Sequence, residues 1–161
     1  MRTFAALLLI AFALNTNLNI AQTKKQKATK TTVKTPFVWE GANLYFLMTD
    51  RFFDGNPTKQ TYFNRTKPTA KLRGFEGGNL RGIIQKLDEG YFDKLGVNAI
   101  WFTPIVEQIH DGVDEGTGLT YGFHGYWTKD WTRLDPNFGT EKELAELIQK
   151  AHAHGIRFIM D

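Results

Sequence analysis

Three short apolar runs alternate with two amphipathic segments between residues 43 and 160, and this alternation constrains the fold more than any other feature. The runs cover 43–49, 97–103 and 156–160, and their β-branched and aromatic residues predict buried strands. A repeated strand, helix, strand order requires parallel strands joined by right-handed crossovers. The sequence therefore predicts an α/β protein, either a doubly wound sheet or a (β/α) barrel.

Both intervening segments carry helix signals of their own. Apolar residues from 80 to 91 fall at helical spacing, Asn79 can cap the start of the helix, and Gly96 can close its end. Ahead of the third run, Thr140 and Glu143 match a capping box that would open a second helix. We therefore expect two helices between three strands.

The segment after the first predicted strand separates two classes of α/β protein. A dinucleotide-binding sheet would show Gly-x-Gly-x-x-Gly there, whereas this chain reads DRFFDGNP over 50–57. Glycines do cluster at 74–82, but their spacing is that of turns and close packing rather than of a phosphate loop. A nucleotide-binding protein is thus the weakest of the alternatives.

The connection after the second strand, 104–139, is far longer than the usual βα loop of about 2 to 6 residues. In a barrel such loops lie at the C-terminal face, where active sites are built. Flat aromatic rings suit the apolar faces of pyranose sugars, and a histidine can donate to a sugar hydroxyl. The alternative is that the aromatic residues only pack the loop onto itself. They are Tyr121, Phe123, His124, Tyr126, Trp127 and Trp131.

The N-terminal 35 residues differ in composition from the rest of the chain. Residues 1–21 read as a signal peptide, since Arg2 precedes an apolar run over 4–14 that is shorter than the roughly 20 residues of a membrane span. An uncleaved anchor is the alternative. Residues 22–35 are rich in Lys and Thr and read as a disordered linker. We expect a secreted or periplasmic protein with no stable membrane span.

Charge and cysteine content exclude several function classes. Residues 1–35 hold six Lys or Arg and no acid, which leaves a net charge of −3 for 36–161. The basic pI therefore gives no reason to expect a nucleic-acid partner. The chain has no cysteine, so disulfides, thiolate metal sites and cysteine nucleophiles are excluded.

Five blocks in register carry a resemblance to a known family. They are MTDRF at 48–52, GGNLRG at 77–82, GYF with LGVNAIWFTP at 90–92 and 95–104, YGFHGYW at 121–127, and DPNFGT at 135–140. From about residue 43 to 161 the chain resembles the N-terminal part of the α-amylase catalytic domain, glycoside hydrolase family 13. The resemblance implies a TIM (β/α)8 barrel, of which 36–161 would supply three strands and two helices.

The resemblance also implies a substrate and roles for five residues. The substrate class is α-linked glucan, and the mechanism is retaining, with two carboxylates about 5 to 5.5 Å apart. Tyr126 resembles the ring that stacks on the sugar whose bond is cleaved, and His124 the donor to its primary hydroxyl. Phe123 and Trp127 resemble the supporting wall. Asp161 matches the first residue of the motif Asp-x-x-x-Asn-His and resembles an organiser of the active site.

In this family the nucleophilic Asp and the acid/base Glu follow the fourth and fifth strands. We therefore expect no catalytic residue in this chain, and no activity from it alone. The acids of the long loop are expected to be solvated charges rather than a catalytic pair; they are Glu107, Asp111, Asp114 and Glu115. The rivals are a transglycosylase or α-1,6-glucan hydrolase of the same family, and a non-catalytic glucan-binding protein.

A structural calcium site is the last element that the resemblance implies. Hard oxygen ligands in two loops suit Ca²⁺. The matching ligands are Asp54, Asn56, the Gly77 carbonyl and Asn79. The chain departs from the family pattern at Lys59 and Gln60, where two more oxygen ligands are expected, and in having a neutral residue at 79.

Overall fold

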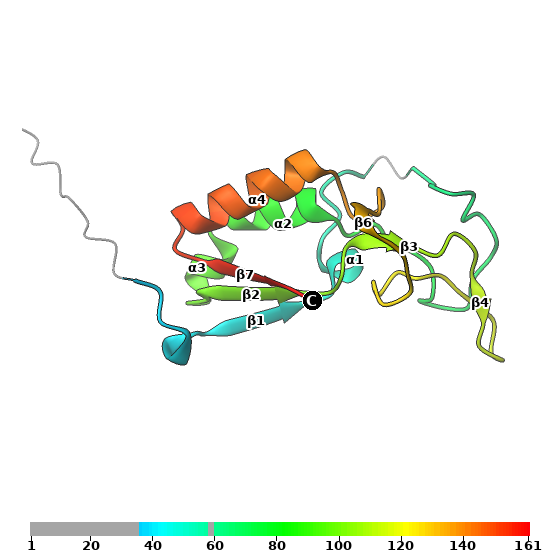
Figure 1. Ribbon diagram of the computed structural model, residues 1–161, viewed down its shortest axis with the longest axis horizontal. Coiled ribbons are helices and arrows are strands. Elements are labelled where there is room, and N and C mark those ends of the chain that lie inside the picture. Colours follow the sequence, from blue (N-terminus) through cyan, green and yellow to red (C-terminus); the bar gives the residue numbers. More distant parts are fainter. Residues whose placement is uncertain (1–35, 58–59) are drawn as a thin grey trace, which may run out of the picture. The chain divides into compact units, whose positions relative to one another are not determined.

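A parallel sheet of three strands forms the centre of the fold (Figure 1). The computed structural model describes residues 36–57 and 60–161, so the predicted signal peptide and linker lie outside the described residues. The strands are β1 (Leu44–Leu47), β2 (Ala99–Phe102) and β7 (Arg157–Met160), in the order β1-β2-β7. Both pairings are parallel, which confirms the predicted α/β arrangement.

Two helices cover one face of this sheet (Figure 1). They are α2 (Leu80–Asp88) and α4 (Glu141–Ala153). The predicted capping box at the start of α4 is present, with the Glu143 carboxylate accepting from Thr140 N at 2.9 Å and Thr140 Oγ1 accepting from Glu143 N at 3.3 Å. These local signals were sufficient because a helix start depends on residues within one turn.

The first helix is shorter than its apolar pattern predicts. We expected it to run past Tyr91 toward Gly96, but α2 ends at Asp88 and a separate turn, α3 (Tyr91–Lys94), follows. Gly90 lies between them with φ at 68°. This left-handed conformation ends the first helix, and glycine adopts it without steric cost. Phe92 on α3 is nevertheless fully buried. Apolar side chains thus face the core on both sides of the break between the two helices.

The core lies between the sheet and the helices. Apolar side chains of β2, α2, α3 and α4 fill it with almost no exposed surface: Leu80, Ile83, Ile84, Leu87, Phe92, Ile100, Phe102, Leu147 and Ala151. The other face of the sheet carries Phe46 and Trp101, whose rings meet edge to face at 5.1 Å, and Phe46 is half exposed. Among the described residues the three parallel strands form no closed barrel, and the arrangement is that of a partial TIM barrel.

The long connection between β2 and α4 holds more structure than the sequence predicts. It contains β3 (Val106–Gln108) paired antiparallel with β6 (Thr128–Leu134), and the small hairpin β4 (Val113–Asp114) and β5 (Leu119–Thr120). These elements lie beyond the C-terminal ends of the parallel strands (Figure 1). Two short turns, η1 (Trp39–Gly41) and α1 (Thr49–Phe52), flank β1, so the first strand ends before Thr49. Among the described residues no helix has the length and apolar character needed to cross a membrane.

Candidate functional site

The predicted sugar-binding residues form one aromatic cluster in the segment 121–127, which we call the aromatic segment. The His124 ring lies 4.7 Å from the Trp127 ring and 5.2 Å from the Phe123 ring, with both arranged edge to face. The Tyr126 ring is nearly parallel to His124 at 5.9 Å and is 53% exposed. Tyr126 therefore presents an open ring face that an apolar sugar face can cover.

A backbone hydrogen bond fixes which nitrogen of His124 can donate. The amide of Tyr126 donates to His124 Nδ1 at 3.0 Å, so the proton of the neutral ring lies on Nε2. Burial lowers the pKa of His124, the Arg51 charge lowers it further, and Glu115 opposes both effects. The ring is thus a neutral donor with Nε2 left for a hydroxyl acceptor.

We predict that His124 titrates below its ordinary pKa of about 6.5 in the folded protein. Since the unfolded chain then binds more protons, the stability contributed by the neutral ring is present above pH 6.5 and is lost as the pH falls through the folded pKa. An NMR titration of the ring protons measures this directly. The His124→Gln variant should lack this component of acid sensitivity. A His124 pKa at or above 6.5 would contradict the assignment.

Tyr126 also reaches the end of the third parallel strand. Its hydroxyl donates to Asp161 Oδ2 at 2.6 Å, and this bond raises the pKa of Tyr126. The backbone amide of Asp161 donates to Phe102 O at 3.3 Å, which continues the pairing of β7 with β2. The structure thus brings Tyr126 and Asp161 together at the C-terminal edge of the sheet, where active sites of barrel enzymes lie.

A buried glutamine holds the backbone of the aromatic segment. Gln108 Oε1 accepts from Trp127 N at 2.7 Å, and its Nε2 donates to Gly125 O at 2.9 Å. Gly125 has φ at 90°, and an added Cβ would lie 2.1 Å from Pro104 O, so only glycine fits there. The loop conformation therefore depends on Gln108 and Gly125. Gly125 lies in the recognised block at 121–127, where it had no predicted role, and Gln108 lies outside every recognised block.

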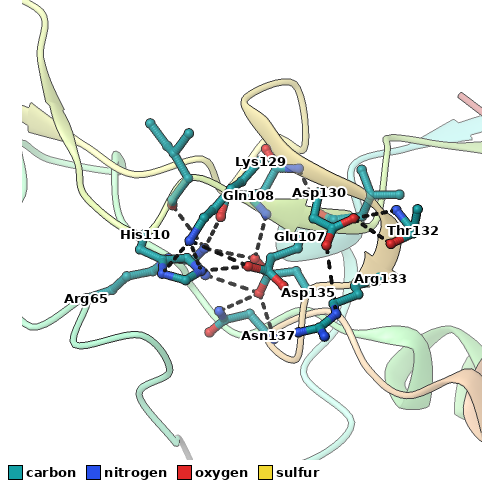
Figure 2. A network of polar contacts seen from close by, with 12 residues as sticks. Arg65, Glu107, Gln108, His110, Lys129, Asp130, Thr132, Arg133, Asp135 and Asn137 are labelled. Carbon is teal, nitrogen blue, oxygen red and sulfur yellow. Dashed lines mark hydrogen bonds and ion pairs between the residues drawn. The ribbon is translucent and has the colours of Figure 1, made fainter.

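A buried ion pair lies below this glutamine (Figure 2). The Arg65 guanidinium donates to both oxygens of Asp135, at 2.8 and 3.1 Å, and to the carbonyls of Gln108 and Ile109 at 3.0 Å each. Asp135 Oδ2 also accepts from Gln108 N at 3.0 Å. Asp135 belongs to a recognised sequence block, whereas Arg65 lies in an irregular segment without any periodic signal that would predict its role.

A second arginine, Arg51, packs on the Phe123 ring of the aromatic segment. Arg51 lies over the Phe123 ring at 3.9 Å and donates to the carbonyls of Leu72 and Gly74 at 2.7 and 3.1 Å. It is also paired with the neighbouring Asp50. Burial raises the pKa of Asp50 to about 6, although the amides of Glu76 and Gly77 and the Arg51 charge act in the opposite direction. Arg51 thus joins the aromatic segment to the turn after β1.

The prediction of solvated acids in the long loop is wrong for one of the four. Glu107 lies on β3 with only 7% of its surface exposed, its Oε1 2.7 Å from His110 Nε2 and 4.0 Å from Lys129 Nζ (Figure 2). These partners offset the cost of burying the carboxylate. Asp111, Asp114 and Glu115 are exposed, and Glu115 is paired with Arg73. The Glu107 carboxylate thus contacts His110 and Lys129 within the loop.

The predicted calcium ligands lie close together. Asp54 Oδ1 is 3.0 Å from Asn56 N and 3.3 Å from Asn79 Nδ2, and Asn79 Nδ2 is 2.9 Å from Gly77 O. Lys59 lies outside the described residues. Within the described part of the chain, no group of three or more His, Cys, Asp or Glu is placed to hold a metal ion. The donor nitrogen at the centre of the cluster does not fit a cation site.

The fold and the C-terminal edge of the parallel sheet can be compared with known proteins. The family model described as the α-amylase catalytic domain matches residues 46–161. The chain belongs to the α-amylase family. A periplasmic α-amylase of Escherichia coli is 44% identical over 136 residues, covering 82% of this chain and 20% of the relative. A cyclomaltodextrin glucanotransferase of Thermoanaerobacterium thermosulfurigenes is 37% identical over 138 residues, covering 84% and 19%. This α-amylase family chain thus spans about one fifth of these relatives.

Solved structures of the family agree with the fold. An α-amylase from Anoxybacillus superposes with a TM-score of 0.62 at 33% identity, covering 78% of this chain and 24% of that one. The γ-cyclomaltodextrin glucanotransferase of Bacillus clarkii gives a TM-score of 0.64 at 34% identity, covering 73% of this chain and 17% of that one. The α-amylase family assignment therefore rests on both sequence and structure.

Proposed function

We propose that the intact protein is an exported enzyme that hydrolyses α-1,4 bonds of starch-like glucans by the retaining mechanism. The observation that carries the proposal is the 2.6 Å hydrogen bond between Tyr126 and Asp161. It unites an exposed aromatic ring with a strand-end carboxylate at the edge where barrel enzymes bind substrates. The periplasmic α-amylase relative supports hydrolysis as the first candidate.

In this proposal the aromatic segment is the sugar platform. Tyr126 stacks on the apolar face of a glucose ring, while the Nε2 proton of His124 donates to a hydroxyl of the same sugar. Phe123 and Trp127 hold His124 from two sides. Asp161 orients the Tyr126 ring through its hydroxyl. None of the four aromatic residues carries out bond cleavage.

The nucleophile and the acid/base are proposed to lie outside residues 1–161. Glu107 is engaged by His110 and Lys129, and Asp161 by Tyr126. We therefore expect the 161-residue chain alone to release no reducing ends from maltoheptaose. The chain carrying Asp161→Asn, purified in parallel, measures contaminating activity. Reducing ends that increase with time above that background would contradict the expectation.

A transglycosylase is the second candidate, because a relative at 37% identity is a cyclomaltodextrin glucanotransferase. An α-1,6-cleaving enzyme has less support, from the maltose-complex structure of an Arthrobacter globiformis cyclic α-maltosyl-(1→6)-maltose hydrolase at 30% identity. Product analysis of the intact protein on amylose and on branched dextrin separates them. Linear maltooligosaccharides would indicate hydrolysis, and cyclic products would indicate glucan transfer. Loss of branch points would indicate cleavage of α-1,6 bonds. A non-catalytic protein binds amylose and forms no product.

Export is part of the proposal. The relative from Escherichia coli is described as periplasmic, and residues 1–21 have the composition of a signal peptide. Cell fractionation with N-terminal sequencing tests it. A mature chain that begins after residue 21 outside the cytoplasm supports export, and an unprocessed cytoplasmic chain contradicts it.

A further inference from the structure

The Asn79 side chain has an orientation that its neighbours fix. Its Oδ1 accepts from Gly82 N at 2.8 Å and from Gly55 N at 3.3 Å, while its Nδ2 donates to Gly77 O at 2.9 Å and to Asp54 Oδ1 at 3.3 Å. The reversed amide would set its NH₂ group against two backbone N–H donors and its oxygen against two acceptors. Only one orientation therefore satisfies all four contacts.

This orientation places a donor where a cation would need oxygens. Calcium takes about six to eight oxygen ligands. The two oxygens nearest the centre of this cluster, Gly77 O and Asp54 Oδ1, both accept from the same amide nitrogen. The Asn79 oxygen faces away from them because it caps the first turn of α2. Asn79 thus cannot offer its oxygen to a cation without losing the cap.

The surrounding residues leave little room for rearrangement. Gly77 has φ at 102°, and a Cβ added there would lie 3.0 Å from Asp54 Oδ2, so the carboxylate packs directly against this glycine. Asp54 Oδ1 also accepts from Asn56 N at 3.0 Å. The Gln60 side-chain oxygen, at a position where the family pattern expects a ligand, accepts from the Tyr62 hydroxyl at 2.8 Å. Four oxygens of the cluster thus accept hydrogen bonds within the protein: Asp54 Oδ1, Gly77 O, Asn79 Oδ1 and Gln60 Oε1.

We propose that the Asn79 amide replaces a calcium ion in this chain. It joins the loop after β1 to the start of α2 by hydrogen bonds, at the place where the family resemblance implies a metal. The cluster then keeps its geometry without calcium, because the single carboxylate of Asp54 is shared between the amide of Asn79 and the backbone of Asn56. The inference is independent of whether the intact enzyme hydrolyses or transfers glucans.

The test counts calcium ions bound by the intact protein and by two single variants. Equilibrium dialysis after chelator treatment gives the number of ions per chain, and thermal melts with calcium or EDTA give the shift in Tm. Asp54→Asn should bind the same number of ions as the wild type, and calcium should change its Tm by the same amount. Asn79→Asp should bind one more ion per chain, and calcium should raise its Tm further than it raises that of the wild type.

A third variant keeps the test decisive where Asp54→Asn fails to fold. Asn79→Ser retains a capping oxygen and removes the linking amide, so it should have a lower Tm in both calcium and EDTA and an unchanged number of bound ions. The loss of one bound calcium from Asp54→Asn or from Asn79→Ser would overturn the proposal. The proposal would also fail if Asn79→Asp bound no additional calcium.

Discussion

If the proposed function holds, the Asp161→Asn variant of the intact protein is expected to lose about 100-fold in kcat/KM on maltoheptaose. Asp161 accepts the Tyr126 hydroxyl at 2.6 Å, a charge-assisted hydrogen bond of the strong kind. An asparagine leaves an acceptor but no charge, which weakens the bond and removes a carboxylate from the proposed sugar-binding edge. A small displacement of a positioned ring is sufficient for a loss of this size.

The Tyr126→Phe variant shows how much of the loss in kcat/KM is due to the hydrogen bond that positions the Tyr126 ring. It removes the same hydrogen bond while leaving the Asp161 carboxylate in place. In the proposed function the ring contacts the bound sugar, so the variant should cost about 10-fold through a higher KM. Steady-state kinetics on both single variants and the double variant measure the coupling between them. Additive losses would mean that the two residues act independently and would contradict the positioning role of the bond. A wild-type kcat/KM for Asp161→Asn would contradict it more directly.

The Asp135→Ala variant is expected to destabilise the intact protein by about 3–5 kcal/mol. It leaves the Arg65 guanidinium buried with no counter-ion, since its remaining hydrogen-bond partners are the neutral carbonyls of Gln108 and Ile109. Asp135 also accepts from the Gln108 backbone, and Gln108 holds the aromatic segment. We therefore expect the variant to lose affinity for maltodextrin as well as stability.

Denaturant unfolding of matched variants separates a buried ion pair from a general loss of packing. Replacing both partners, as Arg65→Met with Asp135→Leu, should cost less than Asp135→Ala alone, because no unpaired charge stays buried. The exposed Asp111→Ala is the control and should change stability by less than about 0.5 kcal/mol. An Asp135→Ala protein as stable as this control would show that the pair does not hold the loop.

Much of the fold was predictable because its signals are local. The three parallel strands follow from short apolar runs between helices, and the capping box at Thr140 involves two residues of one helical turn. The break at Gly90 had a signal, a glycine within the apolar pattern, but the periodicity of the buried side chains continued across it. The existence of the elements was thus easier to predict than their ends.

The parts that escaped prediction are joined by long-range contacts. Arg65 and Asp135 are 70 positions apart. The antiparallel strands β3 and β6 are likewise separated in sequence, by a segment that includes the β4–β5 hairpin. Glu107 read as a surface acid because its burial depends on the pairing of β3 with β6, which also brings Lys129 from the opposite strand to 4.0 Å. A periodic pattern records which face of an element is buried, whereas a buried ion pair depends on where two distant segments meet.

The aromatic segment was found by its composition and by family resemblance rather than by periodicity. Its ring types suggested a sugar platform, but the tautomer of His124 depends on a hydrogen bond from the Tyr126 backbone, which no sequence pattern specifies. The same holds for Gln108, a glutamine in a short strand whose side chain fixes the loop. The site residues could therefore be named from sequence, while the contacts that position them could not.

A crystal structure of the intact protein with a bound maltooligosaccharide tests the central claim most directly. We predict that one glucose ring lies on the exposed face of Tyr126, with a hydroxyl about 3 Å from His124 Nε2 and the Tyr126 hydroxyl still bonded to Asp161. A maltooligosaccharide bound elsewhere, with Tyr126 left open to solvent, would contradict the claim.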